Sequence, residues 1–85
     1  LAERGPGSTE RRLAAYRKLL DVGNGVFGPE HSDTALVRFK IADALDELGQ
    51  SREAEEEYRQ TLTVLRKTLG ERHPYTAMCC NALES

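Results

Sequence analysis

Two turn-like segments of this chain carry the same four residues at the same spacing. Each has a glycine, a histidine, a threonine and an alanine: Gly28, His31, Thr34 and Ala35, then Gly70, His73, Thr76 and Ala77, each 42 positions later. The same offset pairs further identical residues: Ala2 with Ala44, Gly7 with Gly49, Tyr16 with Tyr58, Arg17 with Arg59, Leu20 with Leu62 and Val22 with Val64. Identical residues at one fixed offset are typical of an internal repeat, so we expect the chain to stack similar structural units.

The segment before the first turn has a helical period. Its apolar residues stand three and four positions apart: Leu13, Tyr16, Leu19 and Leu20. This spacing predicts an amphipathic helix over about residues 9–27. Residues 1–8 read as a lead-in or turn, and Thr9 is the expected N-cap of the helix. Because two glycines follow closely, the end of the helix stays open between Val22 and Phe27.

Two further helices are predicted to form an antiparallel hairpin over residues 33–69. Apolar residues cover most of the circumference of the first helix, which is typical of a helix packed on two sides. The second has one apolar face, and only a short turn at Gly49 separates the two. Ser32 or Asp33 is the expected N-cap of the hairpin. A fourth helix is predicted to start at residue 74 and to run over residues 74–85.

Composition excludes several function classes. The chain has 85 residues, of which 39% are apolar and 31% charged, and its net charge is −2. This balance predicts a helical protein of the soluble class. The sequence has no cluster of positive charge that would bind nucleic acid or an anionic membrane. No apolar run approaches the roughly 18 residues of a membrane span. Cys79 and Cys80 are neighbours and cannot easily pair, so two free thiols favour a reducing, cytoplasmic location.

The chain resembles the tetratricopeptide repeat (TPR), in the 42-residue form found in kinesin light chains and in many bacterial proteins. The resemblance rests on packing residues and on the turn between units: Ala42, Leu45, Gly49, Ala54, Tyr58, Leu69-Gly70, His73-Pro74 and Thr76-Ala77. The chain departs from the family pattern at Tyr75, which replaces an aspartate after His73-Pro74.

This resemblance implies an all-α fold of antiparallel helix-turn-helix repeats, a fragment of an α-solenoid with about four helices. Residues 9–27 are then the outer helix of a preceding repeat. Residues 33–69 form one complete hairpin, and residues 74–85 start the next inner helix.

In this family the inner helices line a concave groove that holds peptides or partner segments, and the resemblance implies the same function here. The groove-facing candidates, carried over by position, are Leu36, Phe39, Lys40, Asp43, Asp46, Glu47, Met78 and Asn81. For Phe39 a purely structural place in the core is an equal alternative. Because three of the candidates are acidic, a protein or peptide partner with basic residues is favoured.

No pattern in the sequence predicts an enzyme, a metal site or a cofactor. The soft metal-ligand types are His31, His73, Cys79 and Cys80, and they lack the paired spacing of a zinc site. Since both histidines recur with the repeat, a role in the turn explains them better. The glutamates at 53 and 55–57 lie on the polar face of a helix, where solvation accounts for them.

Two further expectations concern the context of the segment. A second function class is a sensor, regulatory or structural segment of a larger multidomain protein, such as a nucleotide-switch signalling regulator. A phosphate-binding loop upstream would favour that alternative. A segment of so few repeats also exposes apolar faces at its two ends, so we expect it to self-associate end to end or in a swapped arrangement.

Overall fold

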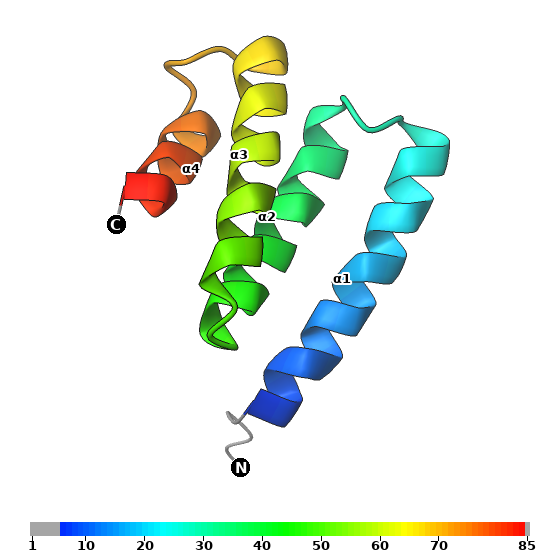
Figure 1. Cartoon of the computed structure of the whole chain (residues 1–85). Coiled ribbons are helices and arrows are strands. Elements are labelled where there is room, and N and C mark those ends of the chain that lie inside the picture. Colours follow the sequence, from blue (N-terminus) through cyan, green and yellow to red (C-terminus); the bar gives the residue numbers. More distant parts are fainter. Residues whose placement is uncertain (1–5, 85) are drawn as a thin grey trace.

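The computed structural model describes residues 6–84, with side chains from residue 8 onward. Four α-helices follow one another: α1 (Pro6–Val26), α2 (Ser32–Glu47), α3 (Ser51–Thr68) and α4 (Pro74–Glu84). Figure 1 shows α1 at one edge of the array and α4 at the other, with α2 and α3 between them. The predicted all-α fold of antiparallel helix-turn-helix units is confirmed.

The first helix starts earlier than predicted. It begins at Pro6, so residues 6–8 are helical, and Thr9 lies inside the helix instead of capping it. Proline is favoured in the first turn of a helix because the N–H that it lacks would have no partner there. The rest of the expected lead-in, residues 1–5, lies outside the described residues, as does residue 85. The helix ends at Val26, within the range that the sequence left open.

Helix α2 is packed on two sides, as its broad apolar surface predicts. It lies against α1 and α3, and α3 also packs against α4. The core consists of side chains from α2, α3 and α4: Ala35, Ile41, Ala42, Leu45, Ala54, Tyr58, Leu62, Leu65 and Cys79. Ala42 and Ala54 are 0% and 2% exposed, and their small side chains allow the two helices of the hairpin to approach closely.

Each turn between helices uses a glycine in the left-handed conformation. Gly28, Gly49 and Gly70 have φ of +93°, +84° and +91°, a region that other L-residues rarely adopt. The N–H of Gly28 donates to the carbonyl of Gly23, and that of Gly70 donates to the carbonyl of Leu65, each at 3.1 Å. These bonds satisfy carbonyls in the last turn of the preceding helix, which is how a left-handed glycine ends a helix.

The two histidines cap the helices that follow these turns. His31 has an extended backbone (φ −90°, ψ 143°), and its Nδ1 accepts a hydrogen bond from the N–H of Asp33 at 3.0 Å. His73 repeats the arrangement, with Nδ1 accepting from the N–H of Tyr75 at 3.1 Å. The prediction that Ser32 or Asp33 caps α2 is therefore wrong, because the helix begins one residue earlier and an imidazole nitrogen replaces the usual side-chain oxygen.

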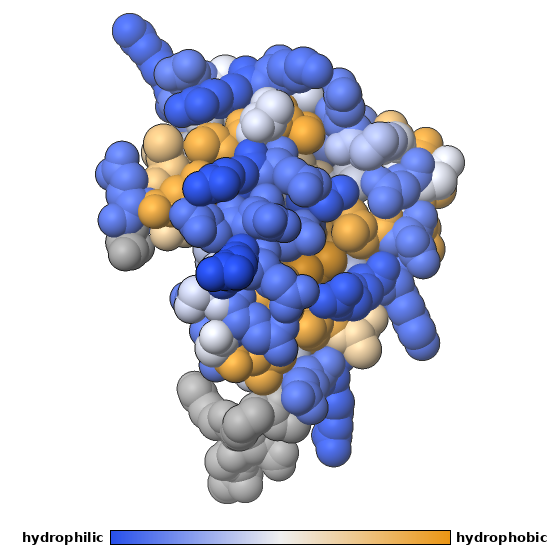
Figure 2. All heavy atoms as spheres, viewed as in Figure 1, coloured by the Kyte–Doolittle hydropathy of each residue, from blue (hydrophilic) through white to orange (hydrophobic). Residues whose placement is uncertain are grey.

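The surface of the array is divided by α3. Figure 2 shows hydrophilic side chains over the outward side of α3, with hydrophobic atoms on both flanks. Within residues 6–84, none of the helices combines the length and the apolar character needed to cross a bilayer.

Candidate functional site

One side of α2 is left uncovered by its two neighbours. The six candidates on this helix recur along that side: Leu36, Phe39, Lys40, Asp43, Asp46 and Glu47. The four charged side chains are exposed, whereas Leu36 and Phe39 are half-buried. We call this side the α2 arc. It presents a mixed-charge surface with two apolar side chains at its edge.

Phe39 takes part in packing. Its ring lies against that of Tyr58, with ring centroids 5.4 Å apart, and it belongs to the side chains that pack on the core. This contact supports the structural alternative for Phe39, and only the exposed part of its ring is available to a partner.

Asp43 is held in place by a buried tyrosine. Its carboxylate accepts a hydrogen bond from the hydroxyl of Tyr58 on α3, and Tyr58 is only 6% exposed. Burial raises the pKa of the Tyr58 hydroxyl, and the hydrogen bond to Asp43 acts in the same direction. The hydroxyl therefore remains a proton donor, and Asp43 is fixed on the arc with its side chain still exposed to solvent.

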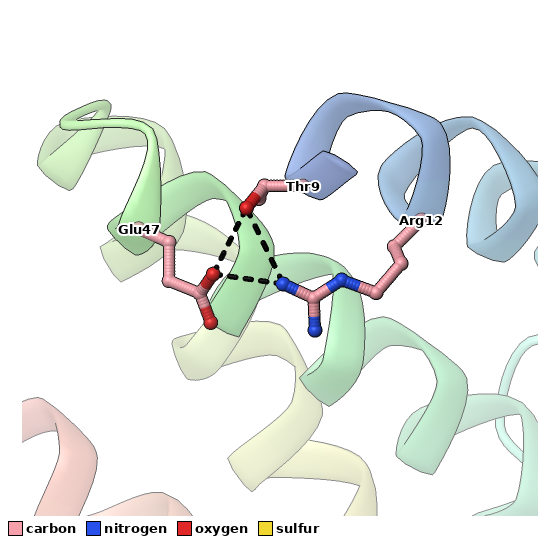
Figure 3. A network of polar contacts seen from close by, with 3 residues as sticks. All are labelled: Thr9, Arg12 and Glu47. Atoms are coloured by element: carbon pink, nitrogen blue, oxygen red, sulfur yellow. Dashed lines mark hydrogen bonds and ion pairs between the residues drawn. The ribbon is translucent and has the colours of Figure 1, made fainter. Parts of the chain in front are cut away.

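Glu47 joins α2 to α1 through two polar side chains (Figure 3). Its Oε1 accepts from the hydroxyl of Thr9 at 3.0 Å and from Nη2 of Arg12 at 2.9 Å. Arg12 also donates to the Thr9 hydroxyl at 3.3 Å, which closes the network. The charge of Glu47 is thus compensated by Arg12, although both side chains are about half exposed.

A shallow hollow of about 140 Å³ lies where α1 meets the α2 arc. Its lining comes from both helices: Arg12, Tyr16, Lys40, Asp43, Ala44 and Glu47. Two cations and two carboxylates therefore surround a space in which a partner's polar groups can form hydrogen bonds and ion pairs. The sequence did not predict the contribution of α1. The spacing of Arg12 and Tyr16, four residues apart on one helix face, was the available signal.

The candidates on α4 are also exposed. Met78 is 44% exposed, and Asn81 lies one turn further along the helix. Tyr75, which sequence reasoning missed, is 42% exposed and stands three residues before Met78, on the same side of α4. Tyr58 lies between the two surfaces, because its hydroxyl bonds Asp43 on α2 and its carbonyl accepts from Sγ of Cys79 on α4 at 3.0 Å.

The soft metal-ligand side chains are used elsewhere in the fold. The histidines cap helices, and Cys79 is fully buried. Burial raises the pKa of the Cys79 thiol to about 11, and the adjacent Cys80 contributes in the same direction. A protonated thiol is a poor nucleophile and a poor metal ligand. In the part of the chain that the structure describes, no three His, Cys, Asp or Glu side chains are grouped so that they could hold a metal ion.

Comparison with known families agrees with this geometry. A family model described as tetratricopeptide repeat matches residues 13–67, which is more than half of the chain. Comparisons with curated proteins and with solved structures give no match.

Proposed function

Because this chain belongs to the tetratricopeptide repeat family, we propose that it is a protein–protein interaction module that binds a peptide or partner segment on the α2 arc and the adjoining side of α4. It contributes binding and no chemistry of its own. One observation carries the proposal. Helix α2 packs on both of its neighbours, yet its third side keeps Lys40, Asp43 and Asp46 exposed in a row.

The same family membership supports an assignment of the helices to repeats. We propose that α1 is the outer helix of a preceding repeat, that α2 and α3 form one complete repeat, and that α4 begins the next. The offset of 42 residues between Gly28 and Gly70 favours the kinesin-light-chain form of the repeat. Two free thiols, Cys79 and Cys80, favour the cytoplasm as its location.

The surface also favours a class of partner. Three carboxylates on the arc outnumber the two nearby cations, Lys40 and Arg12, so basic residues of a partner are attracted. The exposed side chains of Tyr75 and Met78 favour an apolar residue beside them. We therefore propose a peptide that combines basic residues with at least one large apolar side chain.

A charge reversal on the arc tests this proposal. The probe is a peptide selected against the chain from a random display library. The variant Asp46→Lys should weaken its binding at least about tenfold, or about 1.4 kcal/mol. The matched control is Glu56→Lys, which changes an exposed charge on α3, away from the arc, and should leave affinity unchanged. Equal effects of the two variants would show that the peptide does not use the arc.

We also propose that the chain self-associates through its end helices. Leu19, Val22 and Val26 on α1 are 53%, 61% and 68% exposed, and a group of exposed large apolar side chains favours contact with another surface. Sedimentation velocity over a wide concentration range tests this, and a mass that stays monomeric throughout would contradict it.

A further inference from the structure

The turns before α2 and α4 each depend on a contact that a proton would break. His31 and His73 use Nδ1 to accept a hydrogen bond from a backbone N–H of the following helix, at 3.0 Å and 3.1 Å. A nitrogen that accepts in this way carries no proton, so the proton of the neutral ring is on Nε2. A protonated imidazole donates from both nitrogens and accepts at neither. The cap and the protonated ring therefore exclude each other.

Acid acts against both caps for this reason. Histidine ordinarily gains its second ring proton at about pH 6.5, and the chain has no histidine besides these two. A protonated ring also places a positive charge at the start of a helix, which is the positive end of the helix dipole. Because the uncapped ring binds a proton that the capped ring excludes, the cap is complete above this pH range and is lost as the pH falls through it.

The two turns differ in one acidic residue. Asp33 lies in the first turn of α2, two residues after His31, whereas the first turn of α4 contains no acidic residue. The shift of 42 residues takes Asp33 to Tyr75. An aromatic ring lies against each histidine, Phe27 at 4.7 Å from His31 and Tyr75 at 4.9 Å from His73 between centroids, so the ring contacts do not distinguish the turns. The carboxylate of Asp33 compensates a positive charge on His31, and α4 has no equivalent.

The remaining charges at the two turns increase this difference. Each turn has one glutamate that pairs with a cation of α3: Glu30 with Lys67 at 3.0 Å, and Glu71 with Arg66 at 3.8 Å. The turn before α4 also carries Arg72, directly before His73, where the first turn has Glu30. A proton on His73 is therefore added beside a positive charge, which makes it more unfavourable than a proton on His31.

We propose that the start of α4 is an acid-sensitive junction, in which protonation of His73 removes the cap and releases the first turn of the helix. The start of α2 has the same cap, but Asp33 compensates the proton there and the helix responds less. This asymmetry distinguishes the two junctions, although the hydrogen bonds at their caps are alike.

The junction would also affect the binding surface. Tyr75 lies in the turn that is released, and Met78 stands three residues further along α4. Partner binding on α4 should therefore weaken in acid. This consequence rests on the proposed function, whereas the stability of the junction can be measured without a partner.

Two variants with a single histidine separate the junctions. His31→Asn leaves only His73, and His73→Asn leaves only His31; asparagine retains a side-chain acceptor that does not titrate. Urea unfolding at about pH 7.5 and about pH 5.5 measures the unfolding equilibrium constant, and the variant without histidine corrects for other groups. In His31→Asn the constant should rise at least about threefold in acid, and in His73→Asn it should rise less than half as much.

A further substitution tests the role of the missing acid. Tyr75→Asp gives α4 the residue that α2 has at the equivalent position, and this position is exposed. Combined with His31→Asn, it should remove most of the acid response while His73 is still present. Circular dichroism checks that each variant is helical.

NMR of the unchanged chain tests the cap without any substitution. At about pH 7.5, long-range ¹H–¹⁵N spectra should show His73 with a proton on Nε2 and none on Nδ1. At about pH 5.5 the amide of Tyr75 should exchange with solvent faster, relative to its intrinsic rate, and that of Asp33 should change less.

Three results would overturn the inference: a proton on Nδ1 of His73 at the higher pH, equal acid responses of the two single-histidine variants, or a response that Tyr75→Asp leaves unchanged. If unfolding responds as predicted and peptide affinity does not, the junction is confirmed and the placement of the partner on α4 is wrong. The two failures are thus distinguishable.

Discussion

Thr34 and Thr76 occupy equivalent places in the repeat but have different partners. The hydroxyl of Thr76 donates to the carbonyl of Gly70 at 2.8 Å, whereas that of Thr34 has no hydrogen-bond partner within residues 6–84. Both side chains are buried: Thr76 is 2% exposed and Thr34 is 1% exposed. The Thr34 side chain instead packs against Gly23 of α1, and a Cβ added to Gly23 would stand 3.1 Å from Oγ1 of Thr34. Both residues line an apolar hollow of about 170 Å³. The residue 42 positions after Gly23 is Leu65 on α3, and its side chain is fully buried.

This difference predicts opposite results for the same substitution at the two threonines. Thr76→Val removes a buried hydrogen bond and should lower the free energy of unfolding by about 1 kcal/mol. Thr34→Val removes only an unsatisfied hydroxyl, so it should be neutral or stabilising. Urea unfolding of the two variants measures both effects. If Thr34→Val costs as much as Thr76→Val, the Thr34 hydroxyl has a partner in solution and our account of it is wrong.

Cys79 predicts a loss of stability in alkali. Its thiol has a pKa of about 11 in the fold against 9.0 when unperturbed. Between these values the unfolded chain releases a proton that the folded chain keeps, so stability falls as the pH rises. From about pH 8 to about pH 10 the loss should be on the order of 1 kcal/mol. Cys79→Ala should remove this part of the pH dependence, and Cys80→Ala should retain most of it, because burial is the main cause of the raised pKa. Chemical unfolding at the two pH values measures the difference.

At the scale of the helices, the sequence predicted which elements form better than where they begin. Apolar spacing and the glycines at 28, 49 and 70 placed all four helices and the turns between them. The cap of α2 was assigned wrongly because serine and aspartate are commoner caps than histidine, and residue preference does not fix the backbone angle at which the chain turns. The start of α1 was misjudged because Pro6 lies between two glycines, and this pattern reads equally well as a turn.

The histidine cap leads to a prediction about α2. His31→Ala removes the acceptor for the N–H of Asp33 and should destabilise the chain by about 1 kcal/mol. His31→Asn offers a side-chain oxygen at the same place and should retain most of the stability. Thermal unfolding of both variants provides the measurement. Equal losses would mean that His31 acts through its ring contact with Phe27, whose centroid lies 4.7 Å away, and not through the cap.

At the scale of the whole molecule, the sequence indicated which side of α2 carries exposed charged residues but not which other side chains those charges contact. Asp43 and Glu47 were selected by position on the helix, and both are bonded to other helices, through Tyr58 and through Thr9 and Arg12. Such contacts join residues 15 to 38 positions apart, so they depend on how the helices pack and not on local spacing. The exposed Tyr75 was missed because the family pattern has an aspartate there, and the pattern was followed in place of the residue itself.

We propose that a partner binds on the α2 arc and α4. The most direct test is a ¹⁵N NMR titration of the chain with a peptide selected from a random display library. We predict that the largest shift changes fall on the amides of Lys40, Asp43 and Asp46 and continue on α4 at Met78. Amides on the outward side of α3, such as those of Glu56 and Thr63, should change little. Shift changes centred on α3, with the α2 arc unaffected, would contradict the account.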